Sequence, residues 1–136
     1  MFAIKAAVAD PTAQTFVFSR QKTMYGGKFI AAGDTIFLFA SENEGGIGLF
    51  ARGIVTSAEP IARTPGIARQ TPRVSITVRL TAPASRHLGR TELAAFAKGH
   101  DGRPEAEIHF KFYRQATNKI VGLSEPTSAF LSGCFP

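Results

Sequence analysis

The sequence predicts an α+β fold, in which an open β-barrel of five to six mostly antiparallel strands carries short flanking helices. The strongest evidence is the alternation from Arg73 to Leu80, which places four aliphatic side chains on one face of a strand. The apolar run Thr35–Ser41 points to both sides and therefore predicts a central, buried strand. Two short segments near the C-terminal end have capping residues before them and glycine after them, which predicts helices.

The first third of the chain contains two shorter β-like segments and a loop. Phe2–Val8 predicts a first strand, and Ala13–Ser19 predicts a second extended piece. The segment Arg20–Lys28 holds three cations, a tyrosine and a glycine pair, which together are typical of a surface loop. Gly33-Asp34 then forms the turn that leads into the buried strand.

The middle of the chain predicts a returning strand followed by a projecting arm. Ile47–Ser57 is the returning strand, and its Gly48 and Gly53 are expected to mark a bulge or a sharp bend. The loop Glu59–Pro72 contains Ile-Ala-Arg at 61–63 and again at 67–69. This near-repeat is too short for a repeat architecture and too rich in proline for a helix, so we expect a basic arm.

The segment after the alternating strand predicts a short helix and a further strand. Thr91 is expected to cap a helix over Glu92–Lys98, with Gly99 at its end. Over Ile108–Tyr113, apolar and polar residues alternate, which predicts another half-buried strand.

The last part of the chain predicts a turn, a strand and a helix. A turn at Ala116–Asn118 leads into the strand Lys119–Leu123. Ser124 is then expected to cap a helix over Glu125–Ser132, which Gly133 ends.

Length and composition predict one domain over residues 1–136. The chain is 44% apolar, which is enough for one buried core. No segment approaches the roughly 18 apolar residues that cross a bilayer, so we expect a soluble, unprocessed protein without a membrane partner. The single cysteine, Cys134, excludes an internal disulfide and every Cys-x-x-Cys motif, and it suits a reducing cytoplasm.

The basic charge is concentrated in the middle third of the chain. Between Gly45 and Thr91 the basic residues are Arg52, Arg63, Arg69, Arg73, Arg79, Arg86 and Arg90. Only Glu59 opposes them, so this segment accounts for the whole formal net charge of +6. Because guanidinium groups match phosphates and base edges, we expect nucleic-acid backbone contacts. The residues assigned to these contacts are Arg52, Arg63, Arg69, Arg73 and Arg79, and a solvated basic face is the alternative.

A Gly-Asp turn with an apolar strand at 32–41, followed by a glycine-containing strand at 46–55, resembles the pattern of the PUA-like superfamily, especially its EVE and ASCH branches. The tail, with a polar turn, an apolar strand and a short helix over 114–131, is similar to an EVE ending. The resemblance implies an RNA-binding or DNA-binding module that recognises a base, or a modified base, in a pocket beside the barrel.

The sequence departs from the EVE pattern around the expected pocket. EVE domains typically carry aromatic residues there, often tryptophan, and this chain has no tryptophan. We therefore assign Phe39 and Tyr25 to the pocket. Where EVE proteins often have Tyr-His-Ser, this chain has Phe39-Ala-Ser41, so the resemblance carries over Ser41 but no histidine.

The segment 114–118 is a dense polar cluster in which arginine and amide side chains can contact base edges while Tyr113 stacks. A plain polar turn is the alternative. Together with the loop at 20–28, it gives the expected ligand-binding residues. These are Arg20, Gln21, Lys22, Tyr25, Phe39, Ser41, Tyr113, Arg114, Gln115 and Asn118. The ligand expected is a nucleic acid or a nucleotide-like small molecule.

The competing hypothesis is an enzyme. Some ASCH proteins are amidohydrolases that act on modified nucleosides through Lys, Thr and Glu, and here Lys22, Thr23 and Glu59 are the candidates. Lys22 and Thr23 are adjacent rather than spaced as in those enzymes, so we favour binding over catalysis.

No metal or cofactor is expected. The histidines at 87, 100 and 109 lack a second ligand three or four residues away. A Gly-x-Gly-x-x-Ala match over 46–51 lacks the acidic residue of a dinucleotide fingerprint.

Overall fold

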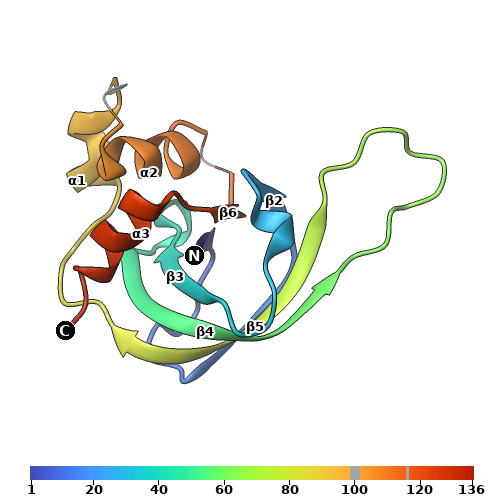
Figure 1. Cartoon of the computed structure of the whole chain (residues 1–136), viewed down its shortest axis with the longest axis horizontal. Helices are drawn as coiled ribbons and strands as arrows, with labels where there is room; N and C mark the ends of the chain where they lie inside the picture. Colours follow the sequence, from blue (N-terminus) through green and yellow to red (C-terminus); the bar gives the residue numbers. More distant parts are fainter. Residues whose placement is uncertain (99–101, 116) are drawn as a thin grey trace.

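The computed structural model describes residues 1–98, 102–115 and 117–136, and the strands in these ranges form a closed barrel (Figure 1). The strands are β1 (Phe2–Ala6), β2 (Thr15–Met24), β3 (Thr35–Ala40), β4 (Gly48–Pro60), β5 (Arg73–Pro83) and β6 (Lys119–Gly122). Their order around the barrel is β1-β3-β4-β5-β2-β6. The predicted α+β barrel is confirmed, but the barrel is closed rather than open.

Strand β6 closes the barrel. It pairs with β1 in antiparallel orientation and with β2 in parallel orientation. The pair β1–β3 is also parallel, whereas β2–β5, β3–β4 and β4–β5 are antiparallel. The expectation of mostly antiparallel pairing is therefore confirmed. Closure gives every described strand a neighbour on each side, which reduces the unpaired edges that invite aggregation.

The alternation of side chains along the strands builds two apolar layers. Inside the barrel, Ile76 of β5 packs in one cluster with Leu38 of β3. Outside the barrel, Phe37 of β3 packs in a second cluster with Phe112 from a covering helix. All residues from Ile36 to Ala40 are buried, as expected for a strand with apolar residues on both faces.

Three short α-helices cover the outer layer on the side of the barrel away from the arm (Figure 1). They are α1 (Arg90–Leu93), α2 (Pro104–Phe112) and α3 (Glu125–Ser132). Three-residue 3₁₀ turns are η1 (Gly27–Phe29), η2 (Glu42–Glu44) and η3 (Ala94–Phe96). None of the described helices is long and apolar enough to span a membrane.

The strand predicted over 108–113 is wrong, because residues 108–112 belong to α2 and Tyr113 caps its end. Pro104 occupies the first helical turn, where its missing N–H costs nothing, and acidic residues follow it there. Ile108 and Phe112, four residues apart, share the buried face, while Phe110 is 43% exposed. Over such a short segment, the alternation of apolar residues is also compatible with the period of a helix.

The loop predicted over 20–28 is also wrong for most of its length. Strand β2 continues to Met24, because Thr23 pairs with Ile120 and Met24 pairs with Val121 of β6. Only the turn after Met24 interrupts the chain before η1. The partner strand, which lies almost a hundred residues later, overrides the local preference of the Gly-rich segment.

The helix predicted over 92–98 begins earlier and is shorter than expected. Its cap is Gly89 rather than Thr91, and the Gly89 amide donates to Glu92 Oε1 at 2.8 Å. The α-helical part ends at Leu93, and η3 follows. Gly99, the predicted terminator, lies outside the described residues.

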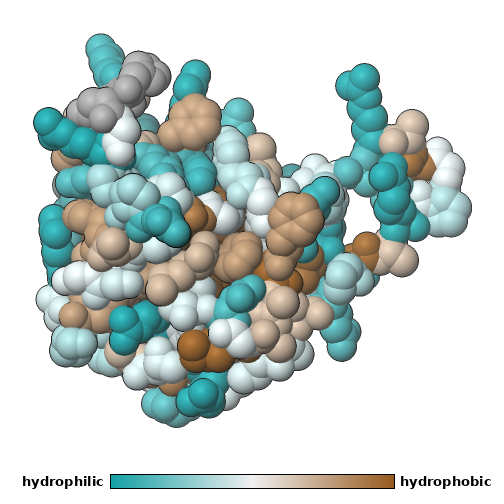
Figure 2. Space-filling model, viewed as in Figure 1, coloured by the Kyte–Doolittle hydropathy of each residue, from teal (hydrophilic) through white to brown (hydrophobic). Residues whose placement is uncertain are grey.

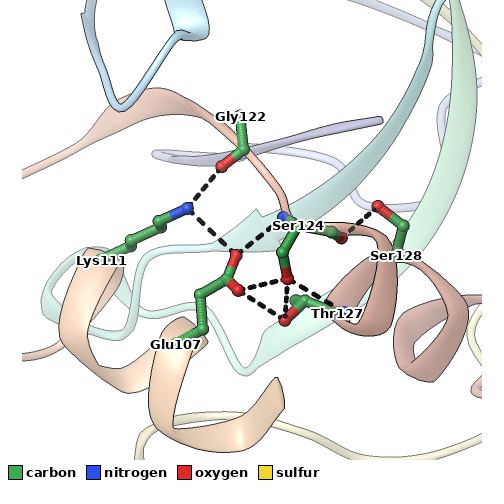
Figure 3. A network of polar contacts seen from close by, with 6 residues as sticks. All are labelled: Glu107, Lys111, Gly122, Ser124, Thr127 and Ser128. Carbon is green, nitrogen blue, oxygen red and sulfur yellow. Dashed lines mark hydrogen bonds and ion pairs between the residues drawn. The ribbon is translucent and has the colours of Figure 1, made fainter. Parts of the chain in front are cut away.

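The last helix is as predicted. It begins after Ser124 and ends before Gly133, and the Thr127 amide donates to Ser124 Oγ at 3.3 Å. Ser124 also takes part in a polar network that joins α2 to the start of α3 (Figure 3). The Glu107 carboxylate of α2 accepts from Ser124 Oγ at 2.5 Å and from Lys111 Nζ at 3.0 Å. Lys111 Nζ donates also to the Gly122 carbonyl at 2.7 Å, which ties the helices to β6.

The bend predicted at Gly53 is present. The pairing of β4 with β5 shifts register between Arg52 and Gly53. A Cβ at Gly53 would lie only 2.7 Å from the Arg79 carbonyl oxygen, so the close approach of the two strands requires glycine.

Beyond the bend, β4 and β5 run out into the arm, which we define as residues 61–72. Figure 1 shows the arm projecting from the barrel, and Figure 2 shows it standing clear of the body of the molecule with hydrophilic side chains along it. The predicted projecting arm is confirmed.

Candidate functional site

A depression of about 510 Å³ lies at the base of the arm and is called here the large pocket. Its lining includes four cationic and five apolar side chains: Arg20, Lys28, Arg63, Arg73, Pro60, Ile61, Ala62, Pro72 and Val74. No carboxylate is among the described residues that line it. A concave surface with apolar walls and arginine forks can hold a planar, polar ring and neutralise a neighbouring phosphate.

A second depression of about 290 Å³, called here the small pocket, shares Arg20 and Arg73 with the large pocket. Its lining is polar throughout, and consists of Arg20, Gln21, Lys22, Arg73, Thr117 and Asn118. Strand β2 supplies the first three of these residues, and the segment before β6 supplies the last two. The two pockets therefore adjoin at the pair Arg20 and Arg73.

Arg20 is fixed at this junction by an unusual backbone conformation. Its φ is +53°, which is rare for residues other than glycine, and it lies where β2 bulges between Phe18 and Gln21. The Arg20 amide donates to Ser75 Oγ at 2.9 Å, and its carbonyl accepts from Arg73 Nη1 at 2.6 Å. Strained backbone that neighbours hold in place is typical of functional sites.

The arm is stiffened by its own hydrogen bonds. Gln70 Nε2 donates to the carbonyls of Thr64 and Ile67 at 2.8 Å each, and Gln70 Oε1 accepts from the Thr64 amide. Arg63 Nη2 donates to the Ala68 carbonyl at 3.0 Å. Arg69 is exposed and makes no hydrogen bond, ion pair or ring contact within the described part of the chain. Its guanidinium is therefore available to a partner.

Two buried lysines lie behind the small pocket. Lys5 and Lys119 are paired across β1 and β6, and each is 1% exposed. Lys5 Nζ donates to the last carbonyl of α2 at 2.7 Å, while Lys119 Nζ donates to the carbonyls of Gln115 and Thr117 at 3.3 and 3.1 Å. Burial, together with repulsion from Lys5 and then from Lys22, lowers the pKa of Lys119 to about 8. Lys119 therefore lies close to two other cations, while the carboxylates of Glu42 and Glu44 interact with Lys5.

The structure brings together four of the expected ligand-binding residues. Arg20, Gln21, Lys22 and Asn118 all line the small pocket. Asn118 is held by a hydrogen bond from its Nδ2 to Glu44 Oε1 at 2.9 Å.

Three other expected residues are buried or half-buried away from both pockets. Phe39 is 1% exposed and packs on Phe112, with ring centroids 5.2 Å apart. Ser41 is also 1% exposed, and its Oγ has no hydrogen-bond partner among the described residues. The Tyr113 hydroxyl donates to the Glu42 carboxylate at 3.0 Å, and burial followed by this carboxylate raises the pKa of Tyr113. None of the three lines either pocket.

The remaining expected ligand residues lie on a surface beside α2. The Arg114 guanidinium lies over the Phe110 ring, 5.2 Å from its centroid, and Tyr25 contacts the same ring at 5.9 Å. Gln115 contributes its carbonyl to Lys119. A role for these three in ligand binding stays a prediction.

The arginines assigned to nucleic-acid contacts separate into two groups. Arg63 and Arg69 belong to the arm, and Arg73 lies at its base. Arg52, in contrast, lies over the Phe135 ring at 5.0 Å, and Arg79 is exposed midway along β5. Arg52 precedes the end of β4 by eight residues, or about 26 Å along a strand. The arm, rather than the whole basic third, therefore gathers free positive charge near the pockets.

The catalytic hypothesis finds no support in the geometry. Lys22 and Thr23 are successive residues of β2, so their side chains point to opposite faces of the barrel wall. The Thr23 hydroxyl donates to the Pro72 carbonyl at 2.7 Å. Glu59 lies on β4, which is separated from β2 by β5.

The described residues contain no group of three His, Cys, Asp or Glu side chains placed to hold a metal ion. His87 Nε2 lies 3.2 Å from Glu92 Oε1, and His109 lies on α2, where burial lowers its pKa. His100 is outside the described residues.

Several pocket residues were missed by sequence reasoning. Lys28 lines the large pocket, Thr117 lines the small one, and Gln70 both lines the large pocket and stiffens the arm. The near-repeat contained a usable signal, because Gln70 is the residue by which its second copy differs from the first.

Comparisons with known proteins identify the fold. No family model matches the chain, and no curated protein matches it significantly. The solved DUF55 domain of human thymocyte nuclear protein 1 is similar at a TM-score of 0.63 and 15% identity, over 96% of this chain and 96% of that one. A structure of human THYN1 in complex with DNA containing 5-methylcytosine is similar at a TM-score of 0.65 and 17% identity, over 96% and 95% of the two chains. At these identities the likeness shows a shared fold over almost the whole chain, which agrees with the α+β barrel predicted from the sequence.

Proposed function

We propose that this protein is a nucleic-acid-binding module that recognises a single base, modified or unmodified, at the base of its arm. The observation that carries the proposal is the large pocket, which combines apolar walls with four cations and has no lining carboxylate. Apolar walls suit the faces of a base, and arginine forks suit its edge and the adjoining phosphates. The arm extends this positive surface along the path of a bound strand.

The similar human structure supports the choice of partner. It contains DNA with 5-methylcytosine, and its fold covers almost the whole of this chain. Nucleic-acid binding on a shared fold is an argument by analogy, so it adds to the pocket chemistry and does not replace it.

Within this proposal, different residues contact the backbone phosphates, the edge of the base and its faces. Arg63 and Arg69 neutralise backbone phosphates, which positions the strand without regard to sequence. Arg20 and Arg73, held against each other at the pocket junction, contact the base edge. Ile61 and Pro72 provide apolar contact with the base.

A binding titration tests the proposal. Fluorescent oligonucleotides, single-stranded and duplex, with cytosine or with 5-methylcytosine at one position, are titrated with the intact protein at several salt concentrations. We expect affinity to fall linearly with salt on a log-log plot and to differ between the two bases. Absence of binding to every oligonucleotide at low salt would overturn the proposal. Equal affinity for all bases would reduce it to non-specific backbone binding.

A further inference from the structure

We propose that the small pocket is a phosphate-binding site, so that one nucleotide spans both pockets, with its phosphate in the small one and its base in the large one. This inference rests on the proposed function, since it assigns the ligand's parts to the two pockets. The ligand group is a phosphate oxyanion, which a nucleic-acid backbone and a free nucleotide share.

The lining of the small pocket is suited to an oxyanion. Arg20, Lys22 and Arg73 are cations, and the other lining residues offer amide and hydroxyl groups. No apolar side chain and no carboxylate is among the described residues that line it. A base would find no surface on which to stack there, and a metal ion would be repelled, whereas a phosphate gains charge-assisted hydrogen bonds.

The donors are held in place without a ligand. The bulge at Arg20 is fixed through Ser75 and Arg73, as described above. Asn118 is held by the hydrogen bond that its Nδ2 donates to the Glu44 carboxylate. The Arg20 guanidinium and the Lys22 ammonium make no hydrogen bond within the described part of the chain, so both remain available. Preorganised donors lose little entropy when an anion binds.

Two buried lysines, Lys5 and Lys119, lie near residues of the small pocket. Lys119 Nζ is bonded only to two backbone carbonyls among the described residues, and Lys5 lies beside it. The carboxylates of Glu42 and Glu44 offset part of the charge of Lys5, and Glu42 also accepts from Tyr113 and, at 2.7 Å, from the Arg90 amide. An anion in the small pocket would therefore offset the repulsion that Lys119 experiences from Lys5 and Lys22.

The size of the two pockets supports this division. The small pocket holds about 290 Å³ and the large pocket about 510 Å³. Because both are bordered by Arg20 and Arg73, a ligand that fills both would contact these two residues. A nucleotide has a form suited to this, with a charged group joined by a sugar to a planar base.

Calorimetric titration of the intact protein tests the assignment. The probes are a nucleoside, its 5′-monophosphate, a dinucleotide with an internal phosphodiester, and inorganic phosphate. We expect the monophosphate to bind at least about tenfold more tightly than the nucleoside, because each charge-assisted hydrogen bond is strong. Inorganic phosphate should compete with the monophosphate. The dinucleotide shows whether a phosphodiester is sufficient for binding or a terminal phosphate is required. If the monophosphate and the dinucleotide both bind more weakly than the nucleoside, the phosphate site is overturned.

Two matched variants locate the effect. Lys22→Met removes a cation from the small pocket only, and Lys28→Met removes one from the large pocket only. We expect Lys22→Met to abolish most of the difference in affinity between the monophosphate and the nucleoside, and Lys28→Met to preserve that difference. Lys22→Gln, with circular dichroism of each variant, guards against loss of folding. Equal loss of the gain in both lysine variants would overturn the assignment.

The outcomes separate this inference from the proposed function. Oligonucleotide binding with no gain from the phosphate would overturn the phosphate site and leave the proposed function standing. Binding of inorganic phosphate by a protein that binds no oligonucleotide would support the site and overturn the proposed function. Absence of binding to all probes would overturn both.

Discussion

Glu107 shows how one charged side chain joins separate elements of this protein. Its carboxylate accepts from Ser124, Lys111 and Thr127, and thereby links α2 with the start of α3 (Figure 3). Burial alone would raise the pKa of Glu107, but these hydrogen bonds outweigh it and hold the pKa below its ordinary value of 4.5. A carboxyl of this kind stabilises the fold above its unfolded pKa, and the contribution is lost as pH falls through the folded value.

We therefore expect Glu107→Gln to lower the free energy of unfolding by about 1–3 kcal/mol at neutral pH, since it weakens a satisfied, partly buried network. The loss should shrink in acid, where the wild-type carboxyl is protonated too. Chemical denaturation at neutral pH and below the folded pKa measures both values. Glu105→Gln, on the same helix turn but outside the network, should change neither. A loss of the same size at both pH values would contradict a role for the carboxylate charge.

At the residue level, the sequence predicted which kinds of side chain form the candidate site better than it predicted where each side chain lies. Arg20, Gln21, Lys22 and Asn118 were expected at a ligand site, and they line one pocket although almost a hundred residues separate the first three from the last. Phe39 was misplaced because an aromatic residue at a strand end can face either side of a sheet. Its direction is set by the register of β3 with β1, which no local pattern contains.

At the level of elements, the strands with strict alternation or continuous apolar character were predictable, and the helix α2 was not. Ile108, Phe110 and Phe112 fit a strand by their spacing, but two of them are also one helical turn apart. The deciding signal was Pro104 followed by two acidic residues, which is typical of a helix start. The predicted second strand ended too early, because the last residues of β2 are extended through their pairing with β6.

The arm is the element whose role is most directly testable. Because the Arg69 side chain is free and the arm is stiffened by Gln70, Arg69 is placed to neutralise one phosphate. We expect Arg69→Ala to weaken binding to all oligonucleotides alike and to flatten the salt dependence by about one unit of slope. Salt-dependent fluorescence titration measures this slope.

Arg86→Ala is the matched control for the arm. It removes the same charge, but Arg86 lies beyond the opposite end of β5, over the Phe130 ring. Binding and slope should stay at wild-type values. If the two variants weaken binding equally, overall charge and not the arm determines affinity.

At the level of the whole molecule, the bend in β4 allows the barrel to close and the arm to project. Gly53→Ala would place a methyl group against Val78 and the Arg79 carbonyl. We expect a loss of about 1–3 kcal/mol in the free energy of unfolding, because a closed, well-packed wall tolerates added atoms poorly. Thermal denaturation followed by circular dichroism measures it. An unchanged melting temperature would show that the wall can relax at this position.

The closing role of β6 also has a consequence for biosynthesis. A chain leaving the ribosome presents the other five strands first, and β6 is the strand that joins β1 to β2. Until it emerges, the nascent barrel keeps two unpaired strand edges, which are the features that favour association between chains. Thr117 and Asn118 precede β6 directly, so the small pocket is also completed only at this stage. Closure of the barrel and completion of the small pocket therefore depend on the same late segment of the chain.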